Sequence, residues 1–344
     1  MSFLHIANTN FEAELAAESP ANFAALIQSH PIFMQLQFLP LLYAEAEDGI
    51  AVTHAPAPSI SRCHLLEERH FPYQQIESWG ASQSIADWAK KKKLSYQMPE
   101  WEVVKLVNSK AFSFKESQKL PGAALIDSME ELEKWIDKTE GPKVLKTCFG
   151  VSGKGHLFLP SDHRKKFAEQ EFARGQPVIA EPWVERKLDF STQWKIYPDK
   201  IEFLGATICV NDQRGKYNST QVGDLPFLFG KYFPFLEKHQ EKVFPILEKI
   251  KALGYFGHVG IDAMIWGNDK LQPVVEINAR KTMGWIALEI SERRFPKQTI
   301  ALSYLTKSNL SNLLPDAIVQ KNGTLFPFSR KLVVEVLANK SKSS

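Results

Sequence analysis

The sequence has few cysteines and none of the spacings that cysteine-based sites require. Cys63, Cys148 and Cys209 are far apart and odd in number, and no CxxC or Cys/His zinc spacing occurs. This pattern argues against both a disulfide framework and a structural zinc site. It predicts a reducing, cytoplasmic setting.

Long apolar segments and a strong charge bias are also missing. Apolar residues make up 44% of the 344-residue chain but never form a run as long as a membrane span. Glu12 and Glu14 interrupt the N-terminal segment, so no signal peptide is predicted. The formal net charge is only +3, which argues against a dedicated nucleic-acid binder. We therefore expect a soluble protein with neither a nucleic-acid nor a membrane partner.

Arrangements for covalent catalysis are likewise lacking. The sequence offers no convincing Ser/His/Asp or Cys/His pattern. His156 and His258 lie near the proposed site, but a lone histidine is more often structural. If the protein is an enzyme, we expect it to work without a protein nucleophile.

Helical and strand patterns alternate along the chain, which predicts an α/β protein. Ser128, with Glu131 three positions on, predicts the capped start of a helix. The patterns also predict a strand at 41–45, a hairpin turned at Pro198-Asp199 and a helix at 297–306. The segment 99–105 is expected to join a small N-terminal unit to the rest of the chain.

The segment VVEINARKTMG carries the clearest chemical pattern. Glu276, Asn278 and Arg280 are spaced by two, so on a strand their side chains would leave the same face. Asp262 on a neighbouring strand would add a second carboxylate. Hard oxygen ligands beside a fixed cation suit a magnesium–polyphosphate complex. A strand with a polar, solvent-facing side explains the same residues and stays open.

Three glycines and a lysine lie in Phe149-Gly-Val-Ser-Gly-Lys-Gly155, between two predicted strands. Such a loop can bring backbone N–H groups close to a phosphate, although it is neither a Walker loop nor GxGxxG. Lys146 precedes it on an apolar strand, where an unpaired lysine would be costly. Lys110, at a predicted helix start, is a second candidate for phosphate binding. For either lysine, an ordinary surface role remains the alternative.

The end of another apolar strand reads Glu181-Pro-Trp-Val184, with Asp189 five residues later. A strand end has backbone groups that can pair with an adenine edge, and Asp189 could bind a ribose diol. A proline-broken linker with a buried tryptophan is an equal alternative.

The order of these elements resembles the ATP-grasp superfamily over residues 103–306. The resemblance implies an α/β (α+β) chain in which an ATP-grasp fold of two α+β subdomains clasps ATP, preceded by a small α/β domain. The implied boundaries are 1–105 for the N-terminal domain, 106–330 for the ATP-grasp domain, with subdomains 106–182 and 183–330, and 331–344 for the C-terminal segment.

The resemblance also implies roles for individual residues. Lys110 and Lys146 would contact the α- and β-phosphates, and Ser152, Gly153 and Lys154 would close over the β- and γ-phosphates. Glu181, with the backbone of Trp183 and Val184, would bind adenine, and Asp189 would bind the ribose. Asp262, Glu276 and Asn278 would ligate Mg²⁺, with Mn²⁺ as an alternative ion, and Arg280 would steady the reacting phosphate.

One position departs from the family pattern. Several relatives have arginine two residues before the metal aspartate, where this chain has Gly260. A second cation would then have to come from Arg214, Lys216 or Lys231. Ser82, Arg214 and Lys281 are candidates for holding a substrate carboxylate.

The implied reaction is ADP-forming ligation of a carboxylate to an amine through an acyl phosphate, with an amino acid or peptide as the first guess. The implied partners are small-molecule carboxylates and amines, with a homodimer left open. An ATP-grasp kinase or thioester-forming ligase is one alternative. A non-catalytic ATP-binding protein is the other, although a complete metal site argues against it.

Overall fold

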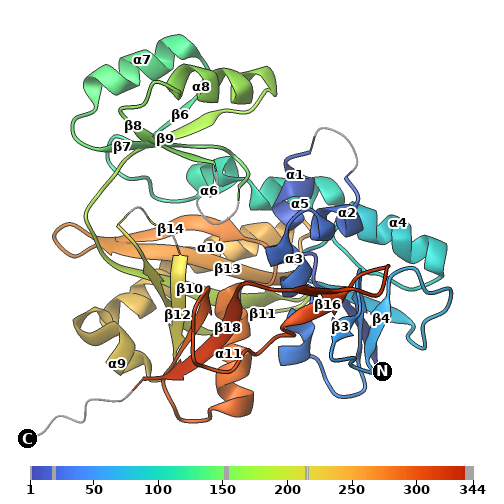
Figure 1. Cartoon of the computed structure of the whole chain (residues 1–344). Coiled ribbons are helices and arrows are strands. Elements are labelled where there is room, and N and C mark those ends of the chain that lie inside the picture. The colour runs from blue at the N-terminus through green and yellow to red at the C-terminus, as the bar shows by residue number, and fades with distance from the viewer. Residues whose placement is uncertain (1, 18–20, 151–154, 214, 216, 338–344) are drawn as a thin grey trace, which may run out of the picture. The chain divides into compact units, whose positions relative to one another are not determined.

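The computed structural model describes residues 2–17, 21–150, 155–213, 215 and 217–337 (Figure 1). The chain divides into two compact units. Unit 1 comprises Met1–Trp101, Asn218–Gly230 and Arg280–Ser344, and unit 2 comprises Glu102–Tyr217 and Lys231–Ala279. The domain boundaries expected at residues 105, 182 and 330 stay predictions.

A four-stranded parallel sheet forms the centre of unit 1, in the order β4-β2-β1-β5. Parallel neighbours require crossover connections. Helices form the connection from β1 to β2, whereas the one from β2 to β4, described throughout, contains no helix. Leu4, Ile6, Ile27 and Ile85 belong to its buried apolar core. The elements of this region are β1 (Phe3–Ile6), α1 (Phe11–Leu15), α2 (Phe23–Gln28), α3 (Pro31–Leu36), the 3-10 helix η1 (Leu39–Leu42), β2 (Gly49–Val52), β3 (Pro56–Ala57), β4 (Cys63–Leu65), β5 (Gln75–Ser78) and α4 (Gln83–Lys92).

The later segments of unit 1 are mostly antiparallel. Strand β15 pairs with β12 on one side and with β18 on the other, and β16 lies between β17 and β3. The elements are β12 (Tyr217–Val222), α9 (Leu225–Phe229), α11 (Met283–Arg294), β15 (Ile300–Leu305), β16 (Ala317–Val319), β17 (Leu325–Pro327) and β18 (Lys331–Val336).

Unit 2 contains a small antiparallel sheet in the order β6-β9-β7-β8. Helices α7 and α8 pack on this sheet (Figure 1), and Leu132, Leu145 and Val178 belong to the shared apolar core. Ser128 caps α7 by accepting from the Glu131 N–H, as the sequence predicts. The elements are β6 (Ala124–Ile126), α7 (Met129–Lys138), β7 (Lys143–Lys146), β8 (His156–Leu159), α8 (Arg164–Ala173) and β9 (Val178–Pro182).

A larger antiparallel ladder in unit 2 has the order β14-β13-β10-β11. Helix α10 packs on one face of it, where His239 contacts Phe190 and Thr192. The opposite face carries the candidate site. The elements are α5 (Trp101–Asn108), α6 (Lys110–Glu116), β10 (Arg186–Ile196), β11 (Ile201–Asn211), η2 (Gly230–Tyr232), α10 (Pro234–Ala252), β13 (Gly257–Trp266) and β14 (Lys270–Asn278).

Two local predictions are wrong. The expected strand at 41–45 overlaps the 3-10 helix Leu39–Leu42, where Pro40 fixes a helical φ. The expected helix at 297–306 is strand β15, whose pairing with two neighbours outweighs a short helical pattern. The expected join at 99–105 contains the boundary between the two units, at Trp101 and Glu102, and most of it belongs to helix α5.

No helix in the described parts of the chain is both long enough and apolar enough to cross a membrane.

Candidate functional site

Three polar side chains gather on one face of the β13–β14 ladder in unit 2. Asp262 lies directly opposite Glu276 in the register, and Gly260 lies opposite Asn278. Alternate residues of a strand share a face, so Asn278 follows Glu276 on the same side. The Asn278 amide nitrogen donates to Asp262 Oδ2 over 3.1 Å. The structure thus brings together the residues that the sequence predicts as metal ligands.

The donor chemistry of this face fits Mg²⁺ held partly by non-protein oxygens. Among the residues that the structure describes, no group of three or more His, Cys, Asp or Glu side chains could hold a metal ion. Asp262 and Glu276 supply two carboxylates, and Asn278 supplies an amide oxygen. Mg²⁺ usually retains several waters beside one or two carboxylates and substrate phosphates. The three side chains therefore fit as a partial coordination shell.

Lys110 provides a counter-charge to this carboxylate face. It begins α6, and the Ser109 side chain caps that helix by accepting from the Ala111 N–H. Its Nζ lies 2.7 Å from Glu276 Oε1 and donates to the Gly150 carbonyl over 3.1 Å. Only 7% of Lys110 is exposed, and a charge buried to that extent needs such partners. A predicted phosphate-binding lysine is thus paired with a predicted metal ligand.

A second buried ion pair joins Lys146 of β7 to Glu181 of β9. The Nζ–Oε2 distance is 2.5 Å, and the two side chains are 6% and 18% exposed. Nearby, the pKa of His156 is lowered to about 4, because burial disfavours the charged imidazolium and the Lys146 ammonium repels it. His156 is therefore neutral at pH 7.

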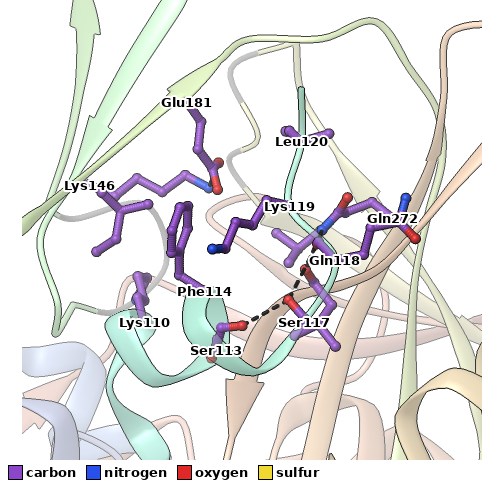
Figure 2. A pocket seen from close by; sticks show the side chains of 13 residues that line it. Lys110, Ser113, Phe114, Ser117, Gln118, Lys119, Leu120, Lys146, Glu181 and Gln272 are labelled. Atoms are coloured by element: carbon purple, nitrogen blue, oxygen red, sulfur yellow. Dashed lines mark hydrogen bonds and ion pairs between the residues drawn. The ribbon is translucent and has the colours of Figure 1, made fainter. Parts of the chain in front are cut away.

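A hollow of about 350 Å³ opens beside the Lys146–Glu181 pair (Figure 2). A second hollow, of about 300 Å³, adjoins it and shares five lining residues with it. The first hollow is lined by Lys110, Ser113, Phe114, Ser117, Gln118, Lys119, Leu120, Lys146, Ile179, Glu181, Gln272, Val274 and Val275. The second is lined by Leu120, Glu181, Pro182, Trp183, Val184, Arg186, Met264, Gln272, Val274 and Val275.

The two hollows differ in chemical character. Three lysines line only the first, whereas Trp183, Val184 and Met264 line only the second, together with a single cation, Arg186, which lies over the Trp183 ring. A ligand with a polyanionic end and an aromatic end would suit this division.

A bulge in β14 forms the wall common to both hollows. Between the cross-strand pairs Asp262–Glu276 and Met264–Gln272, β13 advances two residues (264 − 262) and β14 advances four (276 − 272). The consecutive residues Val274 and Val275 consequently both line the hollows, whereas neighbours on a regular strand point to opposite faces. Gln272 Nε2 donates to the Gln118 and Val274 carbonyls, which fixes the wall to the segment after α6.

The residues expected around adenine and ribose already have protein partners. The Trp183 N–H donates to the Pro142 carbonyl over 2.8 Å, so an adenine edge would have to meet the Trp183 carbonyl or the Val184 N–H. Arg186 lies over the Trp183 ring, 4.6 Å from its centroid. Asp189 pairs with Arg186 at 2.9 Å and accepts from Asn211 at 3.1 Å. A ribose would share Asp189 with these groups.

Arg280, the predicted catalytic residue, belongs to unit 1. Its guanidinium forms an ion pair with Glu12, and Nη1 donates to the Lys281 carbonyl over 3.2 Å. The Arg280 and Glu12 side chains are 14% and 10% exposed, so each charge is largely shielded from water. Glu12 is therefore a counter-charge that helps to hold the Arg280 guanidinium in place.

Two candidates for a substrate carboxylate are engaged within unit 1. Ser82 Oγ donates to Glu14 Oε2 over 2.7 Å. Lys281 Nζ lies 2.6 Å from Glu77 Oε1 and 4.9 Å from the centroid of the Tyr43 ring. Both side chains are buried, which favours structural roles for them.

Several predicted residues lie outside the described part of the chain: Ser152, Gly153 and Lys154 of the glycine loop, and the candidate cations Arg214 and Lys216. The remaining candidate, Lys231, pairs with Asp269 at 3.1 Å on the exposed surface of unit 2.

Sequence reasoning missed Lys119, Gln272, Met264 and the two valines of the bulge. Gln272 precedes Glu276 by four positions on one strand, a spacing that could have indicated it. Nothing local distinguishes Lys119 from other surface lysines, since its position follows from the packing around α6.

No protein-family model matches the sequence. A curated relative, the butirosin acyl-carrier protein–L-glutamate ligase of Niallia circulans, is 28% identical over 166 residues, which are 46% of this chain and 37% of that protein. The chain thus spans well under half the length of this relative.

Solved structures resemble the chain over most of its length. Phosphoribosylamine–glycine ligase from Thermotoga maritima is 14% identical with a TM-score of 0.57, covering 88% of this chain and 90% of that one. Biotin carboxylase from Campylobacter jejuni is 15% identical with a TM-score of 0.52, covering 77% of this chain and 71% of that one. N5-carboxyaminoimidazole synthetase from Staphylococcus aureus, solved with ADP, is 13% identical with a TM-score of 0.51, covering 89% of this chain and 83% of that one. At such identities the likeness establishes the fold, and the chain accordingly has the ATP-grasp fold that its sequence predicts.

Proposed function

We propose that the chain is an ATP-dependent, ADP-forming ligase that joins a carboxylate to an amine. One observation carries the proposal: the Lys110–Glu276 contact joins a hollow lined by lysines to the carboxylate face of Asp262, Glu276 and Asn278. The name of the phosphoribosylamine–glycine ligase supports amide chemistry, and both ligase names support an amino acid substrate. The acyl-carrier protein named for the other ligase fits the thioester alternative as well.

The chain's own residues would bind ATP along the two adjoining hollows. The second hollow, which Trp183, Val184 and Met264 line, would receive the base, with Glu181 accepting from its amino group. Lys110 and Lys146 would contact phosphate oxygens, exchanging part of their present pairing with Glu276 and Glu181. Asp262, Glu276 and Asn278 would hold Mg²⁺, which offsets the negative charge of the phosphates when bound.

Chemistry in this proposal occurs between the substrates. A carboxylate oxygen attacks the γ-phosphorus in line, the bond from that phosphorus to the β,γ-bridging oxygen breaks, and ADP leaves. An amine then attacks the acyl carbon and expels inorganic phosphate, which carries away one former carboxylate oxygen, and the amine loses a proton. Arg280 is suited to steady the reacting phosphate because Glu12 restricts its guanidinium.

Two alternatives keep the same nucleotide site. A kinase would transfer the phosphate to a stable acceptor, and a thioester-forming ligase would accept a thiol in place of the amine. A non-catalytic protein would bind ATP without turnover.

A homodimer and a cytoplasmic location also belong to the proposal. Light scattering would test the homodimer, and cell fractionation would test the location.

A screen for ADP release tests the function. Purified protein is incubated with Mg-ATP, amino acids as carboxylates and a panel of amines, beside Glu276→Gln as the matched variant. We expect ADP release from one carboxylate–amine combination, at least about a hundredfold slower in the variant, since a carboxylate beside the phosphates is lost. Tight ATP binding without ADP release for any combination would favour the non-catalytic alternative.

A further inference from the structure

Three lysines line the first hollow, but only two of them face a carboxylate. Lys110 pairs with Glu276 and Lys146 pairs with Glu181. Lys119 is exposed, and no described carboxylate lies within ion-pair distance of its Nζ. The first hollow thus contains one positive charge that the protein leaves unmatched among the described residues.

Lys119 is held at the edge of the hollow by its neighbours in the chain. The Gln118 carbonyl accepts from Gln272 Nε2, and Leu120 is buried and lines both hollows. The Lys119 backbone is therefore anchored on both sides. Its long side chain remains adjustable.

The Lys119 side chain is directed toward Phe114, another residue lining the hollow (Figure 2). Its Nζ lies 4.9 Å from the centroid of the Phe114 ring. An aromatic face attracts an ammonium more weakly than an ionised oxygen does, so an incoming anion can readily replace this contact.

We infer that Lys119 is a third phosphate-contacting residue of the nucleotide site, an inference that rests on the proposed function. Phosphates that approach Lys110 and Lys146 must compete with Glu276 and Glu181 for them, whereas Lys119 has no such described competitor. Lys119 lines the hollow that Lys110 and Lys146 line and does not line the hollow of Trp183 and Val184. It therefore recognises the phosphate chain rather than the base.

Calorimetric titration with Mg-ADP and with adenosine tests this inference. The variants are Lys119→Met, which removes the charge, and Lys119→Arg, which keeps it. Lys115→Met is the matched control, because Lys115 is an exposed lysine of α6 that lines neither hollow. We expect Lys119→Met to bind Mg-ADP about tenfold more weakly, as for loss of one charged hydrogen bond. Adenosine binding should stay unchanged, and Lys119→Arg should retain most of the affinity for Mg-ADP.

The outcomes separate this inference from the proposed function. If wild type binds Mg-ADP and Lys119→Met binds it equally well, the role of Lys119 is refuted while the nucleotide site stands. An equal loss for adenosine and Mg-ADP would refute it too, because Lys119 would then act through the shape of the hollow. If wild type binds no adenine nucleotide, both proposals fail.

Discussion

Replacing Lys110 by methionine should weaken nucleotide binding and strengthen the binding of a divalent ion alone. Methionine retains the apolar stem of the lysine but removes the ammonium, which lies 2.7 Å from Glu276 Oε1. In this variant the phosphates of the nucleotide lack the Lys110 ammonium as a binding partner. A metal ion, in contrast, no longer competes with that ammonium for the Glu276 carboxylate. A purely structural lysine would not produce these opposite effects.

The magnitudes follow from charge and burial. Two unit charges about 4 Å apart have an interaction energy of roughly 4 kcal/mol at an effective dielectric constant of 20. Lys110 can withdraw from an arriving ion, so we expect the affinity for Mn²⁺ without nucleotide to rise by only about tenfold. Removing one partner of a fully buried pair costs about 3–5 kcal/mol of unfolding free energy. Since the Glu276 side chain is 26% exposed, we expect a loss of about 2 kcal/mol.

Electron paramagnetic resonance of free Mn²⁺ would measure metal binding without nucleotide, and calorimetry would measure Mg-ADP binding. Urea unfolding of Lys110→Met, Glu276→Gln and the double variant completes a cycle, with Lys115→Met as the control. We expect the double variant to be less destabilised than the sum of the single ones. Unchanged Mn²⁺ affinity, or additive losses of unfolding free energy, would refute the reasoning.

Three further predictions concern unit 2. Asn108→Ala should lower the free energy of unfolding by about 2 kcal/mol, because the Ala279 N–H donates to Asn108 Oδ1 over 2.9 Å and would lose its acceptor. Asn108→Asp keeps an acceptor, so urea unfolding should show a smaller loss of unfolding free energy for this variant. Stability should fall as the pH drops from about 6.5 to 4, because the pKa of buried His239 is lowered to about 4 and the unfolded histidine therefore binds more protons in that interval. His239→Gln should flatten this decline in pH-dependent urea unfolding, and an unchanged profile would exclude His239 as its source. Glu181→Gln should leave Lys146 buried without its charged partner. Mg-ADP should therefore raise the melting temperature more in this variant than in wild type. An equal or smaller rise would count against phosphate contact by Lys146.

The sequence predicts local features of unit 2 well because their causes are local. The two-residue spacing of Glu276 and Asn278 places both side chains on one face of any strand. Ser128 and Glu131 predict the start of α7 because a capping box needs only a few consecutive residues. The ATP-grasp fold is predicted in the same way, from the order of several such elements.

Partners distant in the sequence could not be predicted. Lys110 and Glu276 are 166 positions apart, and neither residue shows from the sequence that it pairs with the other. The bulge in β14 depends on its register against β13, so the lining role of Val274 and Val275 follows only from the paired strands. The helix expected at 297–306 failed for the same reason, since β15 is stabilised by two neighbouring strands.

Oxygen transfer from the substrate carboxylate to inorganic phosphate tests the central claim most directly. The active carboxylate, once found in the screen, is labelled with ¹⁸O in both oxygens and incubated with Mg-ATP, the amine and the protein. An acyl phosphate predicts one ¹⁸O atom in each phosphate released, together with ADP and the amide. Unlabelled phosphate, or AMP and pyrophosphate in place of ADP and phosphate, would contradict the claim.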